Sequence, residues 1–124
     1  MWRRLSVWWW QKVMRAGQPS GARAGYDAGM NQPAILVQHR PDQSTFEAIV
    51  DGHRCVADYR RDGQVLRMTH TFVHPALEGR GIAAQLVVAA LQWARDEGLR
   101  VDPQCSYVRI YIQRHAQWQD LLAP

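Results

Sequence analysis

The sequence has no apolar run that approaches 18 residues, so it offers no candidate transmembrane helix. It also has only two cysteines, Cys55 and Cys105, which are too few for a disulfide framework and predict a reduced, cytoplasmic setting. No pair or cluster of residues has the spacing of metal ligands, and we predict no metal site. The 124 residues, 47% of them hydrophobic, suffice for one domain with an ordinary core.

Acidic residues are scarce in one part of the chain only. Residues 1–29 carry five basic side chains against Asp27 alone, whereas from Met30 onward ten arginines balance ten acidic residues. The formal net charge of +4 therefore belongs entirely to the first 29 residues. The remainder has no electrostatic reason to bind nucleic acid.

Residues 1–29 differ from the rest in composition, with four of the six tryptophans and a glycine-rich stretch from Gly17 to Gly29. The apolar stretch from Leu5 to Trp10 is too short for a secretory signal. Tryptophan and arginine together also suit a segment at a membrane surface. We favour an unstructured extension, with Met30 as an alternative true start, and expect the domain to span residues 30–124.

Four runs of residues with β-type patterns follow, at 34–39, 44–50, 53–60 and 64–73. Asp51-Gly52 and Asp62-Gly63 are turn signals, and the connections are too short for crossovers, so these strands should pair antiparallel. Alternation along the last run predicts one shared face for Leu66, Met68, His70 and Phe72.

The hydrophobic period then changes from that of a strand to that of a helix. Apolar residues recur at helical spacing from Ile82 to Ala94, and Gly98 suits a C-terminal cap. A brief strand at 99–101 and a second helix at 106–115 should follow, with Trp118, Leu121 and Leu122 packing onto the core. This order predicts an α+β domain with a mixed sheet.

The glycines before the first helix are the most informative feature for function. In Glu78-Gly79-Arg80-Gly81-Ile82-Ala83-Ala84 they leave backbone N–H groups at the helix start, where the helix dipole also favours an anion such as a pyrophosphate. The run also fits the dinucleotide fingerprint, with Asp102 near the expected spacing. Several antiparallel strands precede it and only 22 residues follow Asp102, which argues against that fold. A purely structural turn is the remaining alternative.

The segment Glu78 to Ala84 resembles the acetyl-CoA pyrophosphate loop of the GCN5-related N-acetyltransferase (GNAT) superfamily. The segments H-T-F-V-H-P-A-L-E-G-R-G-I-A, A-R-D-E-G-L-R-V-D-P-Q-C-S-Y-V and Y-I-Q-R-H are similar to its small, single-domain YjdJ-like subgroup. The resemblance covers Ile35 to Leu122. It implies a mostly antiparallel sheet with a central CoA-binding helix and a short C-terminal helix.

The resemblance also implies how acetyl-CoA would bind. Backbone groups of Thr71, Phe72 and Val73 would pair with the pantetheine arm, like an added strand. The pyrophosphate would accept hydrogen bonds from the loop and helix N–H groups of Gly79, Arg80, Gly81, Ile82, Ala83 and Ala84. The Arg80 side chain would add a charge-assisted contact or stay solvated.

Three side chains are candidates for catalysis of acetyl transfer. Cys105 immediately precedes a predicted helix, whose N-terminus favours the thiolate form of a cysteine, and could carry the acetyl group. The alternative role for Cys105 is that of a small buried hydrophobic residue, which is the role expected for Cys55. His70 could act as a base and Tyr111 as an acid toward the CoA thiolate, although a structural role fits both.

The resemblance and the glycine motif together imply two possible functions. The first is an acetyl-CoA-dependent N-acetyltransferase that moves the acetyl group to an unknown amine, on a protein or a small molecule. The second is a non-catalytic module that binds CoA or acyl-CoA and reports it to a partner.

Overall fold

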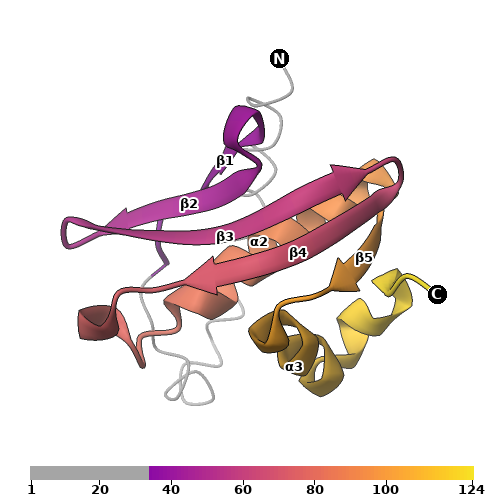
Figure 1. Ribbon diagram of the computed structural model, residues 1–124. Coiled ribbons are helices and arrows are strands. Elements are labelled where there is room, and N and C mark those ends of the chain that lie inside the picture. Colours follow the sequence, from indigo (N-terminus) through magenta and orange to yellow (C-terminus); the bar gives the residue numbers. More distant parts are fainter. Residues whose placement is uncertain (1–33) are drawn as a thin grey trace.

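The computed structural model describes residues 34–124 as a five-stranded sheet with helices (Figure 1). The extension at 1–29 and the boundary at Met30 lie outside these residues. In chain order the elements are β1 (Gln38–Arg40), η3 (Pro41–Gln43), β2 (Thr45–Val50), β3 (His53–Asp62), β4 (Val65–Phe72), η4 (Pro75–Leu77), α2 (Ile82–Glu97), β5 (Arg100–Pro103), α3 (Ser106–Arg114) and η5 (Ala116–Leu121).

The strands lie in the order β1-β2-β3-β4-β5, and each pair but the last is antiparallel. The last pair is parallel because α2 carries the chain back across the sheet before β5 begins. The predicted α+β architecture with a mixed, mostly antiparallel sheet is therefore confirmed. None of the described helices is long and apolar enough to cross a membrane.

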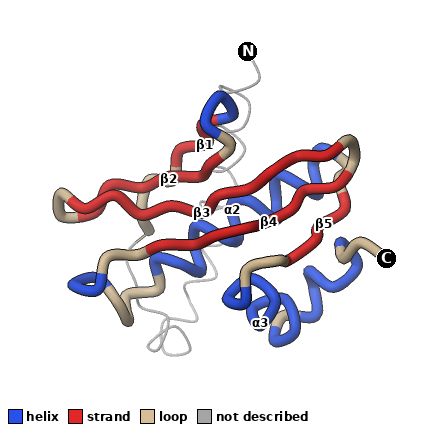
Figure 2. Tube along the Cα trace, in the orientation of Figure 1, coloured by secondary structure: helices blue, strands red, loops and turns tan. Residues whose placement is uncertain are grey.

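Helix α2 lies along one face of the sheet (Figure 2) and supplies much of the core. Its apolar residues at helical spacing, among them Leu86, Val87 and Leu91, are fully buried, and it contacts β2, β3 and β4. Gly98 ends the helix in the left-handed conformation that the sequence predicts. Trp118 and Leu121 are buried as expected, whereas Leu122, whose backbone forms an isolated bridge with Val101, is 38% exposed.

A β-bulge in the middle of β4 corrects the predicted facing of that strand. Tyr59 pairs with Met68 but Asp58 pairs with His70, so Thr69 is an extra residue on β4. The extra residue reverses the alternation beyond it. His70 and Phe72 consequently leave the face of Leu66 and Met68 and are exposed, while Thr71 turns toward the helices. The expectation that all four side chains share one face is wrong for this reason.

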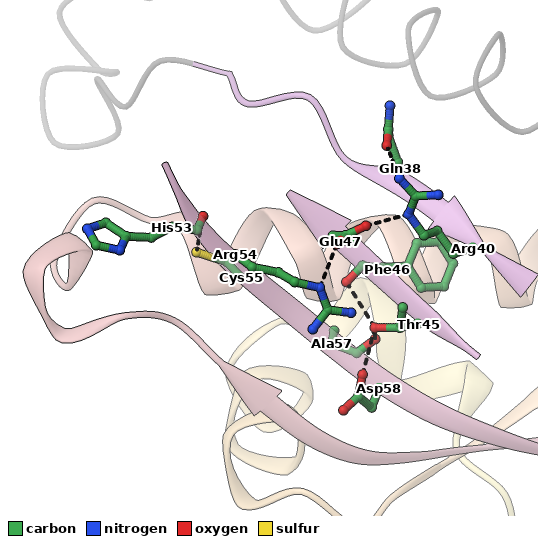
Figure 3. A network of polar contacts seen from close by, with 10 residues as sticks. All are labelled: Gln38, Arg40, Thr45, Phe46, Glu47, His53, Arg54, Cys55, Ala57 and Asp58. Carbon is green, nitrogen blue, oxygen red and sulfur yellow. Dashed lines mark hydrogen bonds and ion pairs between the residues drawn. The ribbon is translucent and has the colours of Figure 1, made fainter. Parts of the chain in front are cut away.

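The face of the sheet opposite α2 carries a polar network centred on Glu47 (Figure 3). The Glu47 carboxylate accepts hydrogen bonds from the guanidinium groups of Arg40 and Arg54, the latter at 2.6 Å. The Arg40 contact and then the Arg54 contact hold the pKa of Glu47 below its usual value. These contacts tie β1, β2 and β3 together outside the hydrophobic core.

Replacing Glu47 by glutamine should lower the free energy of unfolding by about 1 kcal/mol near neutral pH, the upper range for partly exposed ion pairs. The pKa of Glu47 is lower in the folded state than in the unfolded chain, so its ionisation stabilises the fold above about pH 5. That contribution is lost as the pH falls through the folded-state pKa. Urea unfolding at a series of pH values should show the difference shrinking below about pH 4. A difference independent of pH would contradict the ion-pair explanation.

Candidate functional site

Strand β5 pairs with only the first half of β4. The parallel pairing begins at Val65 with Arg100 and ends at Met68 with Pro103. The backbone N–H of Cys105 then donates to the Met68 carbonyl at 2.9 Å, and the chain turns into α3. Among residues 34–124, no strand pairs with this edge of β4 beyond Met68. With respect to residues 34–124, the backbone of β4 beyond Thr71 is therefore available to another extended segment.

The glycine loop has the geometry of a helix start with unpaired amides. Gly79 and Gly81 both have positive φ, at 83° and 73°, a conformation that side chains disfavour. Gly81 is the N-cap of α2, and no described side chain caps it. The N–H groups of Ile82, Ala83 and Ala84 begin the helix and have no partner within it. Their orientation and the helix dipole favour an anion in front of them.

A cavity of about 570 Å³ connects the edge of β4 with the glycine loop. It is within the range of small-molecule sites. Its wall is formed by the end of β4, by the loop after it, by the start of α2 and by one residue of α3. The lining residues of these four parts include Thr71, Val73, Gly79, Gly81, Ala83 and Tyr107.

Cys105 lies beside this cavity at the N-cap of α3 and is partly exposed. The bulge in β4 turns the Thr71 hydroxyl toward it, with Oγ1 3.5 Å from Sγ. Burial raises the pKa of Cys105, but the Thr71 hydroxyl and the backbone N–H groups of Val108, Tyr107 and Thr71 outweigh that effect and lower the pKa overall. The thiolate is therefore favoured at this position. Cys55, by contrast, is completely buried in the core, as predicted.

Three rings are stacked along one side of α3. Tyr107 stacks on Tyr111 with centroids 6.4 Å apart, and Tyr111 stacks on His115 at 3.9 Å. Burial and then the neighbouring Tyr107 raise the pKa of Tyr111. Tyr107 lines the cavity and Tyr111 lies one turn further along α3, outside its lining. The sequence analysis did not single out Tyr107 as a site residue. Its position two residues after Cys105 could have indicated that it lies near the site.

The structure does not bring His70 together with Cys105 and Tyr111. His70 is exposed, and its pairing with Asp58 places it on the opposite side of β4 from Thr71. The reason is the bulge at Thr69, which alternation in the sequence does not reveal.

The Arg80 side chain has a partner within the protein. Its Nη1 donates to the Asp51 carboxylate at 2.8 Å, and both side chains are largely exposed. Asp51 belongs to the turn between β2 and β3, so this ion pair joins that turn to the glycine loop. In residues 34–124, no group of three or more His, Cys, Asp or Glu side chains is arranged to hold a metal ion.

Comparison with known proteins points to one family. The family model described as GCN5-related N-acetyl-transferase matches residues 45–121. Protein NATD1 of Mus musculus is 32% identical over 95 residues, which cover 73% of this chain and 86% of that protein. For Protein NATD1 of Xenopus tropicalis the identity is 30%, with 73% and 88% covered.

The solved structures add support for the fold. The NMR solution structure of a GCN5-like protein from Staphylococcus aureus aligns with a TM-score of 0.59. The alignment covers 72% of this chain and 88% of that one, at 22% sequence identity. The two proteins therefore share a fold.

Proposed function

The chain belongs to the GCN5-related N-acetyltransferase family, and from that premise we propose that it transfers an acetyl group from acetyl-CoA to an amine. The observation that carries the proposal is the N-terminus of α2 at the wall of the cavity, which no side chain of the described residues caps. The N–H groups of Gly79 to Ala84 would hold the pyrophosphate there. The Arg80 guanidinium has five N–H donors and gives one to Asp51, so the others can serve a phosphate.

The end of β4, which no strand among residues 34–124 covers on this edge, supports a path for the pantetheine arm. Thr71, Phe72 and Val73 line the cavity, and their backbone groups can pair with the amides of the arm as a neighbouring strand would. This path runs from the glycine loop toward the point where β4 and β5 separate. Cys105 lies at that point.

We propose that Cys105 carries the acetyl group between the two substrates. Its thiolate would attack the thioester carbonyl, forming a new thioester on Sγ as the sulfur of CoA leaves. An acceptor amine would then attack the acetylated Cys105, regenerate the cysteine and lose a proton. Tyr111 remains a candidate for protonating the leaving sulfur. Direct attack by the amine on acetyl-CoA is the alternative route, for which His70, on the opposite side of β4 from Thr71, is the candidate base.

Isothermal titration with acetyl-CoA, followed by mass analysis of the intact protein, tests the function. We expect binding, one acetyl group on Cys105, and loss of that group when a suitable amine is added. Binding without acetylation or turnover over a broad panel of amines would favour a non-catalytic CoA-binding module. Absence of binding would contradict both functions.

Replacing Thr71 by valine should raise the pKa of the Cys105 thiol, because valine keeps the size of the side chain and removes the hydroxyl that stabilises the thiolate. The rate of alkylation by iodoacetamide as a function of pH measures that pKa, and buried Cys55 does not interfere. We expect alkylation near neutral pH to slow by about threefold to tenfold, as for one lost hydrogen bond. Thr71→Ser keeps the hydroxyl and is the matched control, which should react at the wild-type rate. Equal rates in the valine variant and the wild type would contradict the role of Thr71.

A further inference from the structure

The loop between β4 and α2, residues 73–81, forms a large part of the cavity wall and determines where the glycine amides point. Leu77 is the buried side chain of this loop, at 2% exposure, and it anchors the middle of the loop in the core. The two ends, at His74 and at Arg80, are held in another way.

Both ends contact the turn between β2 and β3, which we call the hairpin tip, residues 51–53. The Asp51 carboxylate accepts a hydrogen bond from Arg80 Nη1 at 2.8 Å. The ring of His53 stacks on that of His74, with centroids 3.9 Å apart and planes 18° from parallel. His74 in turn accepts a hydrogen bond from the Ala76 N–H at 3.0 Å and so caps η4. The hairpin tip therefore touches the loop at its beginning and at its end.

The hairpin tip is well suited to hold another segment in place. It consists of a two-residue turn and the first residue of β3, because Val50 pairs directly with His53, and both turn residues have positive φ, 50° for Asp51 and 80° for Gly52. Such turns match the twist of the strands they join and leave little freedom at the tip. Figure 3 shows His53 where β3 leaves this turn, and Figure 1 shows the turn and the end of β4 at the same side of the molecule.

We propose that the hairpin tip is a brace that fixes the glycine loop in the geometry that binds the cofactor, with Asp51 and His53 as positioning residues. This inference rests on the proposed function, because it assigns the pyrophosphate to the loop. Asp51 holds the Arg80 guanidinium through one of its N–H groups, and the other N–H groups can still donate to a phosphate. His53 keeps His74 in place, and with it the first turn of the loop.

The chain supplies its own control for this brace. The hairpin of β3 and β4 also carries an exposed ion pair beside its turn, in which Arg67 Nε lies 2.7 Å from Asp62, the last residue of β3. Neither residue of this pair lines the cavity. Replacing Asp62 by asparagine therefore removes a similar surface ion pair beside another hairpin turn without touching the loop.

The test compares Asp51→Asn with Asp62→Asn by two measurements. In the free protein, hydrogen exchange of the amides at 79–84 should be faster in Asp51→Asn and unchanged in Asp62→Asn. In titrations with acetyl-CoA, Asp51→Asn should bind about two- to fivefold more weakly, the range for loss of one surface ion pair, and Asp62→Asn should match the wild type. His53→Ala should act like Asp51→Asn, whereas His53→Phe retains a stacking ring and should behave as the wild type does.

Two results would overturn the brace. Unchanged loop exchange in Asp51→Asn would show that the ion pair does not position the loop. Tighter binding by that variant would show that Asp51 competes with the phosphate for Arg80. These outcomes are separate from failure of the proposed function, in which the wild-type protein itself binds no acetyl-CoA.

Discussion

Replacing Ala83 by glutamate should weaken acetyl-CoA binding by at least about a hundredfold while the fold is retained. Ala83 lines the cavity in the first turn of α2, so the new carboxylate would lie where the pyrophosphate is proposed to bind. Two like charges about 4 Å apart near a protein surface repel by about 4 kcal/mol, which exceeds the energy of that loss in affinity.

The same substitution should not destabilise the helix. An acidic side chain in the first turn interacts favourably with the helix dipole, and the first turn of α2 has none. The position is therefore a better test than Gly81, where positive φ would add backbone strain to any side chain. Thermal unfolding should give a melting temperature for Ala83→Glu at least equal to that of the wild type.

Ala83→Gln is the matched control for charge. Glutamine has the length of glutamate and no charge, so it should lose much less affinity in the same titration. If glutamate and glutamine weaken binding equally, the loss is steric and the electrostatic argument fails. Wild-type affinity in Ala83→Glu would place acetyl-CoA elsewhere.

Replacing Cys105 by serine should lower turnover by at least about a thousandfold and leave acetyl-CoA binding within about twofold of the wild type. The acyl-cysteine route depends on the thiolate, and a serine hydroxyl remains protonated near neutral pH, so the covalent intermediate is lost. The binding groups on the glycine loop and β4 are unchanged by this substitution. Steady-state rates, titration and intact mass together separate the two effects.

Turnover of Cys105→Ser near the wild-type rate would exclude the acyl-cysteine route and favour direct transfer to the amine. Cys105→Ala gives a second test without a hydroxyl, and it should also show no acetylated protein. The reference is Cys55→Ser, which replaces a buried core residue and should reduce stability rather than remove the acetyl group from Cys105.

The residue pattern was sufficient to predict most of the fold. The helix from Ile82, the turns at Asp51-Gly52 and Asp62-Gly63, and the cap at Gly98 all occur as predicted, because each depends on a local preference of the backbone or on a regular hydrophobic period. The glycine loop could be placed at a helix start for the same reason. The cavity beside the loop, and the lack of a side-chain cap from the described residues, could be found only from the structure. Both depend on which residues surround the loop.

The residues facing Cys105 were decided by tertiary structure alone. The extra residue Thr69 turns Thr71 toward the thiol and His70 away from it. The local sequence Thr69-His70-Thr71 does not predict this bulge. The contact of Arg80 with Asp51, 29 residues away, likewise follows from the folding of the hairpin against the loop. The sequence alone determined the order of the strands and helices and the glycine turn before α2, because these are local, although the first predicted run, 34–39, overlaps β1 only at its end. Which side chains meet across them depends on strand register and packing, which are properties of the whole sheet.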